Sequence, residues 1–400
     1  MVFVTILRML PHRIVTLGSL VIIFWAFIYA FFVFDPASIT DSENISGRQI
    51  FQAKIIDIDR RLDKTFLVVK PLELTEHKIR VTIDNFYEFN KGQVVKISGE
   101  VEAPENFEGF NYQGWLAKDN IAYVIFRPDI TVEGGGISID AKVKNILSAG
   151  INKALLPPAS SLYSAMLIGD KGEFTQENRN NLASSGLSHI VAISGLHITI
   201  ITTLLISVGI YLGLWRRSAG WVAIALIVFY IWMIGTPASA VRAGIMASTV
   251  FLAERFGRPS SSWRALLLAA AVMLAFNPLL IRYDVGFQLS FLAVMGILLF
   301  ARKIEPYISK VPNILHAREV LSMSISAQIF TAPLVLFIFG TFAPFGVLAN
   351  ILVVTILPAV LIAGFIASVA GVLGGPFTVF GAMPAWALSK YIWGVISILG

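Results

Sequence analysis

The stretch Gly186-Leu-Ser-His-Ile-Val-Ala-Ile-Ser-Gly-Leu-His-Ile198 opens a long apolar run that ends near Leu214. This run is long enough to cross a bilayer, which takes about 20 residues of helix. Its first half nevertheless carries Ser194 and His197, which are three residues apart and would share one face of a helix. Since polar groups in hydrocarbon usually face a bundle interior or a water-filled path, we interpret the stretch as a polar seam in a span predicted over Ile190–Leu214.

The composition identifies the class of protein. The chain has 400 residues, of which 56% are hydrophobic and only 14% are charged, whereas a soluble domain has about one quarter charged residues. It therefore reads as a polytopic α-helical membrane protein with one polar insert. It contains no cysteine, which excludes disulfides and thiolate metal sites.

The net charge of +6 is unevenly distributed along the chain. The segment from Asp35 to Lys153 holds 15 Lys and Arg against 18 Asp and Glu, whereas the rest holds 16 against 7. The polar insert is therefore slightly acidic, and the basic surplus lies in short loops between apolar runs. Orientation in the membrane explains such a surplus, so overall basicity is poor evidence for DNA binding.

An apolar run over Ile14–Phe34 follows Arg8, His12 and Arg13. A cleaved signal peptide is the competing interpretation, but the run is long and aromatic-rich and lacks a small-residue cleavage site. We therefore expect residues 1–34 to form a cytoplasmic tip and a first transmembrane helix, with the following segment outside the membrane.

Residues 42–132 have the pattern of a small all-β domain. Turn material separates five short segments rich in Val, Ile and Phe, which we predict as strands: Gln49–Asp59, Thr65–Val69, Ile79–Ile83, Val94–Val101 and Ile121–Ile130. This pattern indicates a small extracytoplasmic barrel or sandwich, OB-like in size. The aromatic residues after the fourth strand, Phe107, Phe110, Tyr112 and Trp115, would either pack across the barrel mouth or stack on unpaired bases.

Residues 139–186 are expected to form amphipathic, interfacial helices, and residues 187–400 a polytopic channel domain. Its candidate spans are Ile190–Leu214, Trp221–Ile234, Ala240–Leu252, Ala265–Ile281, Phe287–Phe300, Val320–Phe339, Gly346–Leu373 and Trp386–Leu399. If the first runs inward, Arg216, Arg255, Arg258 and most other basic residues fall in cytoplasmic loops, as the positive-inside rule requires. The chain ends inside an apolar run at Gly400, so we expect this chain to be truncated at its C-terminus and the natural protein to continue.

Four polar features lie within or beside these spans. They are the Ser194, Gly195 and His197 seam; Arg242; Gln288 with Ser290; and the serines 322, 324 and 326 with Gln328, followed by Asn350. Each alone is explained by helix–helix hydrogen bonding, but together they favour a polar path. Arg242 would contact a phosphate from outside or, alternatively, extend to the lipid headgroups.

Several kinds of chemistry find little support in the sequence. Ser194 and His197 could act as nucleophile and base in an intramembrane hydrolase, but no Gly-x-Ser-x-Gly motif surrounds the serine. The five histidines show no zinc-ligand spacing, and there is no Walker A motif. We therefore expect no metal, no cofactor and no catalysis.

At these residues the sequence resembles the ComEC competence family, the inner-membrane channel for transforming DNA. The Gly169-Asp-Lys171 turn, the Ser194-Gly-Leu-His197 signature, Arg242-Ala243 and Gly286-Phe-Gln-Leu-Ser-Phe291 look like motifs of its competence domain. The segment Glu105–Tyr112 with Trp115 is similar to the linker in the family's N-terminal OB-type domain. The His-x-His-x-Asp-His pattern of the family's C-terminal metallo-β-lactamase-like domain is absent, so no nuclease activity is assigned.

The resemblance implies translocation of single-stranded DNA into the cytoplasm through a multi-pass protein of the bacterial inner membrane. It also implies a cytoplasmic ATP-driven helicase-like motor, an extracytoplasmic DNA receptor and a homo-oligomer as partners. We assign the path lining to Ser194, Gly195, His197, Arg242, Gln288, Ser290 and Asn350, and candidate DNA contacts in the β domain to Arg60, Arg61 and Lys64. The alternatives are the hydrolase and a transporter of small solutes or lipid precursors.

Overall fold

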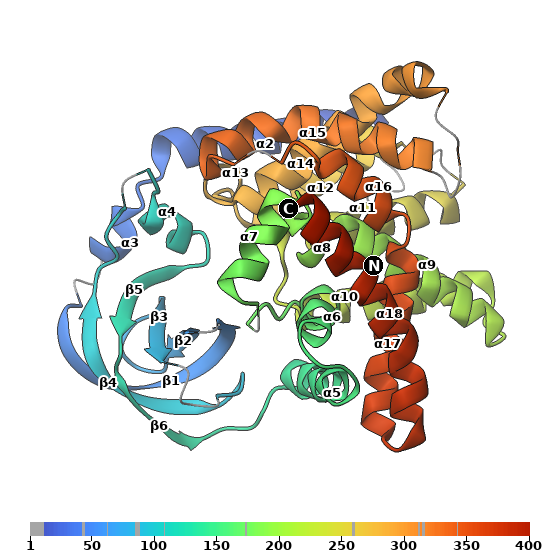
Figure 1. Ribbon diagram of the computed structural model, residues 1–400. Coiled ribbons are helices and arrows are strands. Elements are labelled where there is room, and N and C mark those ends of the chain that lie inside the picture. Colours follow the sequence, from blue (N-terminus) through green and yellow to red (C-terminus); the bar gives the residue numbers. More distant parts are fainter. Residues whose placement is uncertain are drawn as a thin grey trace.

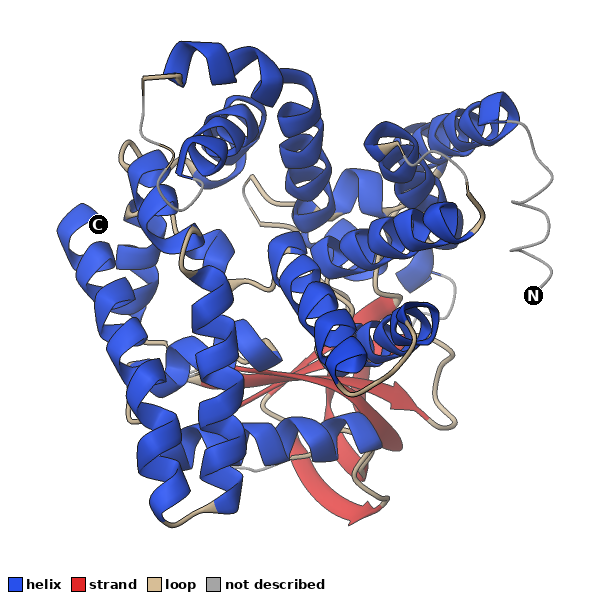
Figure 2. Cartoon of the chain, turned by 90° about the vertical axis from the view of Figure 1, so that its right-hand side faces the viewer, coloured by secondary structure: helices blue, strands red, loops and turns tan. Residues whose placement is uncertain are grey.

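A computed structural model shows a small β-barrel beside a larger bundle of helices (Figure 1). The structure describes residues 12–41, 45–61, 63–84, 89–107, 109–172, 174–257, 261–310, 313, 317–341 and 343–400. The N-terminal tip with Arg8 and the loop residue Arg258 lie outside the described residues. A second view shows the strands gathered at one end of the helical bundle (Figure 2).

Five strands close the barrel. They are β1 (Gly47–Arg60), β2 (Lys64–Pro71), β3 (Lys78–Asp84), β4 (Val94–Glu102) and β5 (Ile121–Phe126). Their order is β1-β2-β3-β5-β4, and β4 pairs back with β1. Alternate side chains such as Ile55, Val81 and Ile97 fill the interior and are at most 1% exposed. The predicted OB-like barrel is thus confirmed.

The predicted fifth strand, Ile121–Ile130, is wrong in one respect, because it is two strands. β5 ends at Phe126, and β6 (Asp129–Gly134) begins after Arg127, whose φ is 47°, and Pro128. Proline supplies no N–H for a ladder and suits a break at a sheet edge. Both halves still pair with β4, so the break bends one edge without opening the barrel.

The aromatic cluster predicted after the fourth strand lies at the short helix α4 (Tyr112–Ala117). The rings of Phe107 and Tyr112 are 5.2 Å apart between centroids, and those of Tyr112 and Trp115 are stacked at 5.9 Å. Leu116 is fully buried against the barrel. The ring faces of Tyr112 and Trp115 therefore pack against neighbouring rings, which agrees with the predicted packing role and not with stacking on bases.

The first helix belongs to the packed body. α2 (His12–Ile28) continues into a π-helical turn, η1 (Tyr29–Val33). Ala26 and Ala30 are fully buried against the helical domain and α4. This packing favours an uncleaved span over a signal peptide.

The remaining helices follow in chain order. They are α3 (Ala37–Asp41), α5 (Ile139–Ala154), α6 (Ala159–Ile168), α7 (Gln176–Ser184), α8 (Ser188–Val191), α9 (Gly195–Tyr211), α10 (Arg216–Met233), α11 (Ala238–Arg255), α12 (Ser262–Phe276), α13 (Leu280–Tyr283), α14 (Val285–Ile304), η2 (Glu305–Ile308), α15 (Ala317–Phe339), α16 (Gly346–Val354), α17 (Leu357–Leu373) and α18 (Pro376–Leu399). A multi-pass helical domain is thus confirmed.

Fewer helices are full-length spans than the nine predicted, the first helix included. In the described part of the chain, four helices are long and apolar enough to cross a membrane: Arg13–Val33, Val285–Ile308, Ala317–Phe339 and Pro376–Leu399. The pair α16 and α17, bent by 55°, would make a fifth. Helices α9, α10 and α12 are shorter, and short helices of this kind are tolerated at membrane depth where they lie within protein.

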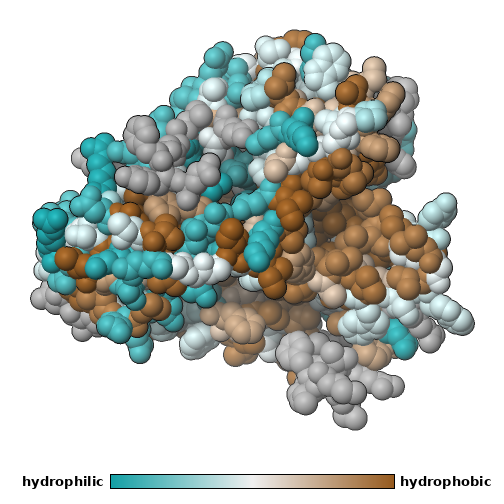
Figure 3. Space-filling view, turned by 90° about the horizontal axis from the view of Figure 1, so that it is seen from below, coloured by the Kyte–Doolittle hydropathy of each residue, from teal (hydrophilic) through white to brown (hydrophobic). Residues whose placement is uncertain are grey.

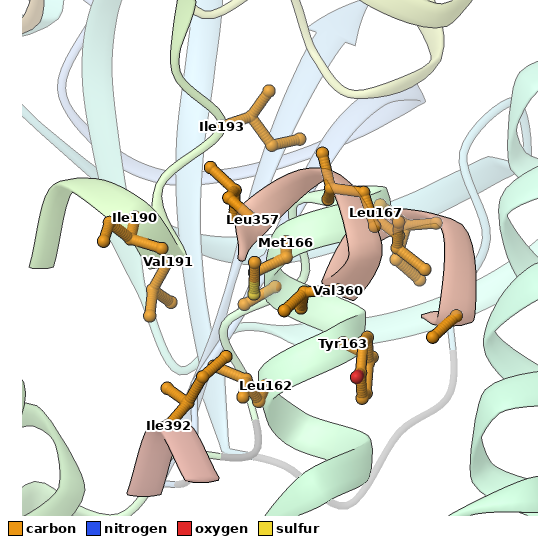
Figure 4. Close-up of a cluster of buried hydrophobic side chains, with 14 of the residues drawn as sticks. Leu162, Tyr163, Met166, Leu167, Ile190, Val191, Ile193, Leu357, Val360 and Ile392 are labelled. Atoms are coloured by element: carbon orange, nitrogen blue, oxygen red, sulfur yellow. The ribbon is translucent and has the colours of Figure 1, made fainter. Parts of the chain in front are cut away.

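The core of the bundle surrounds α6, in which every residue is buried. Leu162, Tyr163, Met166 and Leu167 meet side chains from α8, α17 and α18 (Figure 4). The Tyr163 hydroxyl donates to the carbonyl of Ala385 over 2.9 Å. This burial fixes α6 and the turn that follows it.

The helix α5 packs along α17 through glycine. A side-chain carbon at Gly150 or Gly371 would overlap backbone atoms of the opposite helix, so only glycine permits this approach. The Ser368 hydroxyl donates to the Leu147 carbonyl over 2.9 Å. The predicted amphipathic helix is therefore held by protein along one face.

The barrel contacts the helical domain through side chains, in addition to its covalent connections. Lys118, at the end of α4, lies 3.4 Å from the Asp284 carboxylate, and Asn277 donates to the Lys118 carbonyl over 2.7 Å. On another side, Lys91 pairs with Asp140 at 2.6 Å. Seen from below, the barrel side is largely hydrophilic and the helical side is largely hydrophobic (Figure 3). Polar contacts on two sides thus hold the barrel against the helices.

Candidate functional site

The predicted span Ile190–Leu214 is wrong as one continuous helix. α8 ends at Val191, residues 192–194 are extended, and α9 begins at Gly195. Ser194 lies at the N-cap of α9 and not within it, with φ −107° and ψ 169°. Serine is a preferred N-cap because its side chain satisfies a free N–H of the first turn. The polar seam is thus a break between two helices.

Ser194 and His197 face each other across this cap. The Ser194 N–H donates to His197 Nδ1 over 3.3 Å, and the Ser194 hydroxyl lies 2.8 Å from the same atom. Because Nδ1 accepts, the neutral ring carries its proton on Nε2. Nε2 is buried and has no partner among the described residues. His197 thus offers a buried donor and lacks the acid that would orient a catalytic base.

Arg242 on α11 points into the protein. Its side chain is 7% exposed, Nε donates to the Ser290 hydroxyl on α14 over 2.7 Å, and Nη1 lies 3.6 Å from the Met246 sulfur. No carboxylate in the described part of the chain pairs with it. The structure thus does not show the alternative of an arginine extended to the headgroups.

Gly195 leaves room for the Arg242 guanidinium. A methyl group at Gly195 would lie 2.7 Å from Arg242 Nη2. The Ser239 hydroxyl of α11 donates to the Ile193 carbonyl in the helix break over 2.8 Å. The break therefore meets α11 and α14 at one place. We call Ser194, Gly195, His197, Arg242 and Ser290 the polar cluster.

Two predicted lining residues are used elsewhere. Gln288 donates to the carbonyls of Ile281 and Arg282, over 3.0 and 3.1 Å, and so caps the end of α13. Asn350 lies on α16, where its Oδ1 is buried without a partner among the described residues. Neither side chain makes a hydrogen bond with the polar cluster in the described chain. The serines of α15 act as interhelical contacts: Ser322 donates to Ala301 of α14 over 2.6 Å.

The basic residues predicted in the barrel do not form a free patch. Arg61 pairs with Asp59 at 3.3 Å, and both side chains are about half exposed. Arg60 donates to the Phe89 carbonyl over 2.9 Å, and Lys64 is exposed at the start of β2. The neighbouring Asp59 carboxylate thus reduces the local positive charge at Arg61, although an exposed ion pair of this kind is weak.

Sequence reasoning missed Arg80 on β3. Its guanidinium carbon lies 4.3 Å from the ring centre of Phe66 and 5.0 Å from that of Trp115. The side chain is 8% exposed, and burial lowers the pKa of Arg80, although arginine stays protonated. Arg80 borders a cavity of about 360 Å³ between the barrel and the helices. No sequence signal marks it, because Phe66 and Trp115 come from separate elements.

The described residues contain no group of three or more His, Asp and Glu side chains placed to hold a metal ion. The polar cluster itself offers hydrogen-bonding groups and the positive charge of Arg242.

Comparisons with known proteins relate the chain to one family. The family described as Competence protein matches residues 166–400, which contain the whole polar cluster. The chain is 27% identical over 390 residues to ComE operon protein 3 of Bacillus subtilis (strain 168); the match covers 92% of this chain and 49% of that protein. The chain thus spans about half the length of this relative. No solved structure matches it significantly. Because the family match extends over more than half of its residues, the chain belongs to the competence protein family.

Proposed function

We propose that this chain is the membrane channel component that carries one strand of transforming DNA into the cytoplasm of a bacterium. The observation that carries the proposal is Arg242, a buried cation without a carboxylate in the described chain. Membership of the competence family supplies the process, and the polar cluster supplies a place for a phosphate.

A buried charge in a membrane protein is costly and is usually paired. A carboxylate beside Arg242 would neutralise it permanently and would repel a passing phosphate. Instead, Arg242 is held by the Ser290 hydroxyl, a neutral acceptor that leaves its charge available. The first turn of α9 adds the positive end of a helix dipole at Gly195, and His197 Nε2 adds a buried donor. This set of groups suits transient contact with an anion.

The proposed orientation places the N-terminus in the cytoplasm and the barrel outside. Basic residues such as Arg216, Arg255, Arg302 and Lys303 would then lie in cytoplasmic loops. The barrel would receive the strand and the polar cluster would line its passage. A cytoplasmic ATP-driven helicase-like motor would supply the driving force, and an extracytoplasmic receptor would deliver DNA. A homo-oligomer is also proposed.

The test is uptake of labelled DNA in cells that carry Arg242→Ala, with membrane levels of the protein checked. Arg255→Ala is the matched control, because this exposed arginine ends the same helix. We expect Arg242→Ala to leave DNA bound outside the membrane while cytoplasmic DNA is lost, and Arg255→Ala to take up DNA as wild type does. Normal uptake by a strain lacking the chain would contradict the proposal.

An intramembrane hydrolase is the second candidate, favoured by the 2.8 Å between the Ser194 hydroxyl and His197 Nδ1. A fluorophosphonate probe distinguishes the two functions. Labelling of the wild type that is lost in Ser194→Ala would favour the hydrolase, whereas a channel whose serine only caps a helix stays unlabelled.

A further inference from the structure

The cavity bordered by Arg80 lies where the barrel meets the helical domain, and we call it the junction cavity. It has a volume of about 360 Å³, within the range of ligand pockets, roughly 300–1,000 Å³. Its walls come from β1, β2 and β3, from α4 and α5, and from the turns at Gly169–Asp170 and Ile234–Gly235. Both parts of the protein therefore shape it.

Arg80 is held in this cavity by its two faces. The rings of Phe66 and Trp115 contact the guanidinium at 4.3 and 5.0 Å. Such stacking orients a guanidinium while its N–H groups, which lie in the plane, remain available for hydrogen bonds. Nε is buried without an acceptor among the described residues, and no carboxylate there pairs with Arg80. The side chain is thus positioned and has a side-chain hydrogen bond with Tyr112, while its Nε remains without an acceptor among the described residues.

Charged side chains of both signs surround Arg80 in the cavity. Five aspartates line it, but three are in ion pairs: Asp59 with Arg61, Asp119 with Lys118 and Asp140 with Lys91. The other two, Asp57 and Asp170, are outnumbered by Arg60, Arg80 and Lys144. Asp170 also accepts the Gly172 N–H over 3.0 Å. Ion pairs thus involve three of the five carboxylates, and Arg80 is the buried cation of the lining.

The inner wall of the cavity adjoins the polar cluster. Gly169 and Ile234 belong to this wall, and a methyl group at Gly169 would lie 3.4 Å from Ile193 Cδ1. Ile193 is 6% exposed, belongs to the buried core in Figure 4, and directly precedes Ser194. One apolar side chain thus separates the junction cavity from the helix break.

We propose that the junction cavity is a phosphodiester-binding subsite for single-stranded nucleic acid, in which Arg80 contacts one backbone phosphate. The identity of this ligand rests on the proposed function. Arginine suits the contact because its planar N–H groups match phosphate oxygens. The faces of Phe66 and Trp115 are already used by Arg80 and, for Trp115, by Tyr112. The subsite therefore reads the backbone and not the bases, and binding is independent of sequence.

The test is fluorescence anisotropy with the purified full chain in phosphatidylglycerol nanodiscs and labelled oligonucleotides, dT20 and a mixed sequence. Arg80→Gln should weaken binding of both about tenfold or more, as for loss of a charged hydrogen bond. It should also reduce the slope of log K against log salt by about 0.7, the value for one phosphate of a single strand. Arg48→Gln removes the same charge from an exposed position on β1 outside the cavity and should change affinity less than about twofold.

Two additional experiments test whether Arg80 itself binds the nucleic-acid strand. Phe66→Leu keeps an apolar side chain and removes the ring, so it should reproduce part of the Arg80→Gln effect in a chain that unfolds at the wild-type temperature. Phosphatidylcholine nanodiscs and added inorganic phosphate distinguish a strand from a lipid headgroup or a free anion. An Arg80→Gln effect that disappears in phosphatidylcholine, or equal competition by millimolar phosphate, overturns the subsite.

Wild-type affinity and salt slope in Arg80→Gln would also overturn the subsite. The proposed channel function would be unaffected by that result, because cellular DNA uptake and its dependence on Arg242 are measured separately. Loss of uptake dependence on the chain, with Arg80-dependent binding intact, would instead remove the channel and leave a nucleic-acid site.

Discussion

Gly195→Ala tests the contact between α9 and Arg242 directly. The added methyl group would lie 2.7 Å from Nη2, whereas ordinary contact begins near 3.4 Å. The guanidinium must therefore retreat by roughly 0.7 Å, the difference between these distances. Because Arg242 is a flexible side chain, the backbone need not move and the protein should still fold.

The retreat can stretch the bond from Arg242 Nε to Ser290 from 2.7 Å to roughly 3.4 Å, where a hydrogen bond is much weakened. A hydrogen bond to a charged group contributes about 1.5–3 kcal/mol. Alanine is more favourable than glycine in a helix by up to about 1 kcal/mol, which offsets part of this loss. The free energy of unfolding of Gly195→Ala should therefore fall by roughly 1–2 kcal/mol. If the same contact positions Arg242 for a phosphate, uptake of labelled DNA should fall about tenfold or more.

Unfolding in detergent and cellular DNA uptake measure the two effects. Gly394→Ala is the control, since nothing lies within 4 Å of a methyl group there. The double variant Gly195→Ala, Arg242→Ala should be no worse than Arg242→Ala alone, because the clash disappears with the arginine. Wild-type uptake in Gly195→Ala, or additive losses in the double variant, would refute the reasoning.

Three further predictions concern stability. Ser194→Ala removes the α9 cap and should lower the free energy of unfolding by about 0.5–2 kcal/mol, as measured by thermal unfolding. Gly371→Ala, whose methyl group would overlap Gly150, should cost about 1–3 kcal/mol and reduce the yield of monodisperse protein, unlike Gly394→Ala. Burial raises the pKa of Asp140, but its hydrogen bonds and the positive charge of Lys91 together outweigh burial and leave the pKa below its ordinary value. The pair therefore stabilises the fold above about pH 4 and loses this contribution as pH falls further, so Asp140→Asn should show a flatter unfolding profile between pH 3 and 6.

The barrel was predictable because local patterns decide it. Alternating apolar residues such as Ile79, Val81 and Ile83 fill a barrel interior whatever the rest of the chain does. The break between β5 and β6 carried a signal as well, since Pro128 interrupts the apolar run. The prediction of one strand gave too much weight to hydrophobicity and too little to the missing N–H.

The break before α9 was harder to predict, because its residues are apolar enough for a continuous span. Ser194 can cap a helix or lie within one, and its sequence does not decide which. The Ser239 hydroxyl that holds the Ile193 carbonyl comes from 46 residues away. A tertiary contact thus determines where the helix begins, and periodicity does not contain that information.

The roles of individual polar residues depended on the same kind of information. Gln288 and Ser290 are two residues apart and looked equivalent, yet one caps α13 and the other holds Arg242. Arg80 gave no signal because its two rings come from β2 and α4. Sequence located the helices that carry the polar cluster, but only packing determined which side chains meet.

The short helix α4 connects the two buried arginines. Its Trp115 packs on Arg80 in the junction cavity, and Lys118 at its end lies 3.4 Å from Asp284. Asp284 also caps α14 by accepting the Phe287 N–H over 2.7 Å.

Six residues beyond Asp284, Ser290 holds Arg242. A ligand that moves Arg80 would therefore press on α4, and through the Lys118–Asp284 pair on the first turn of α14. The barrel and the polar cluster are thus mechanically joined through one ion pair and one helix cap. In the proposed channel, Arg80, which would receive an anion in the barrel, and Arg242, which would contact it within the membrane, therefore share the same support.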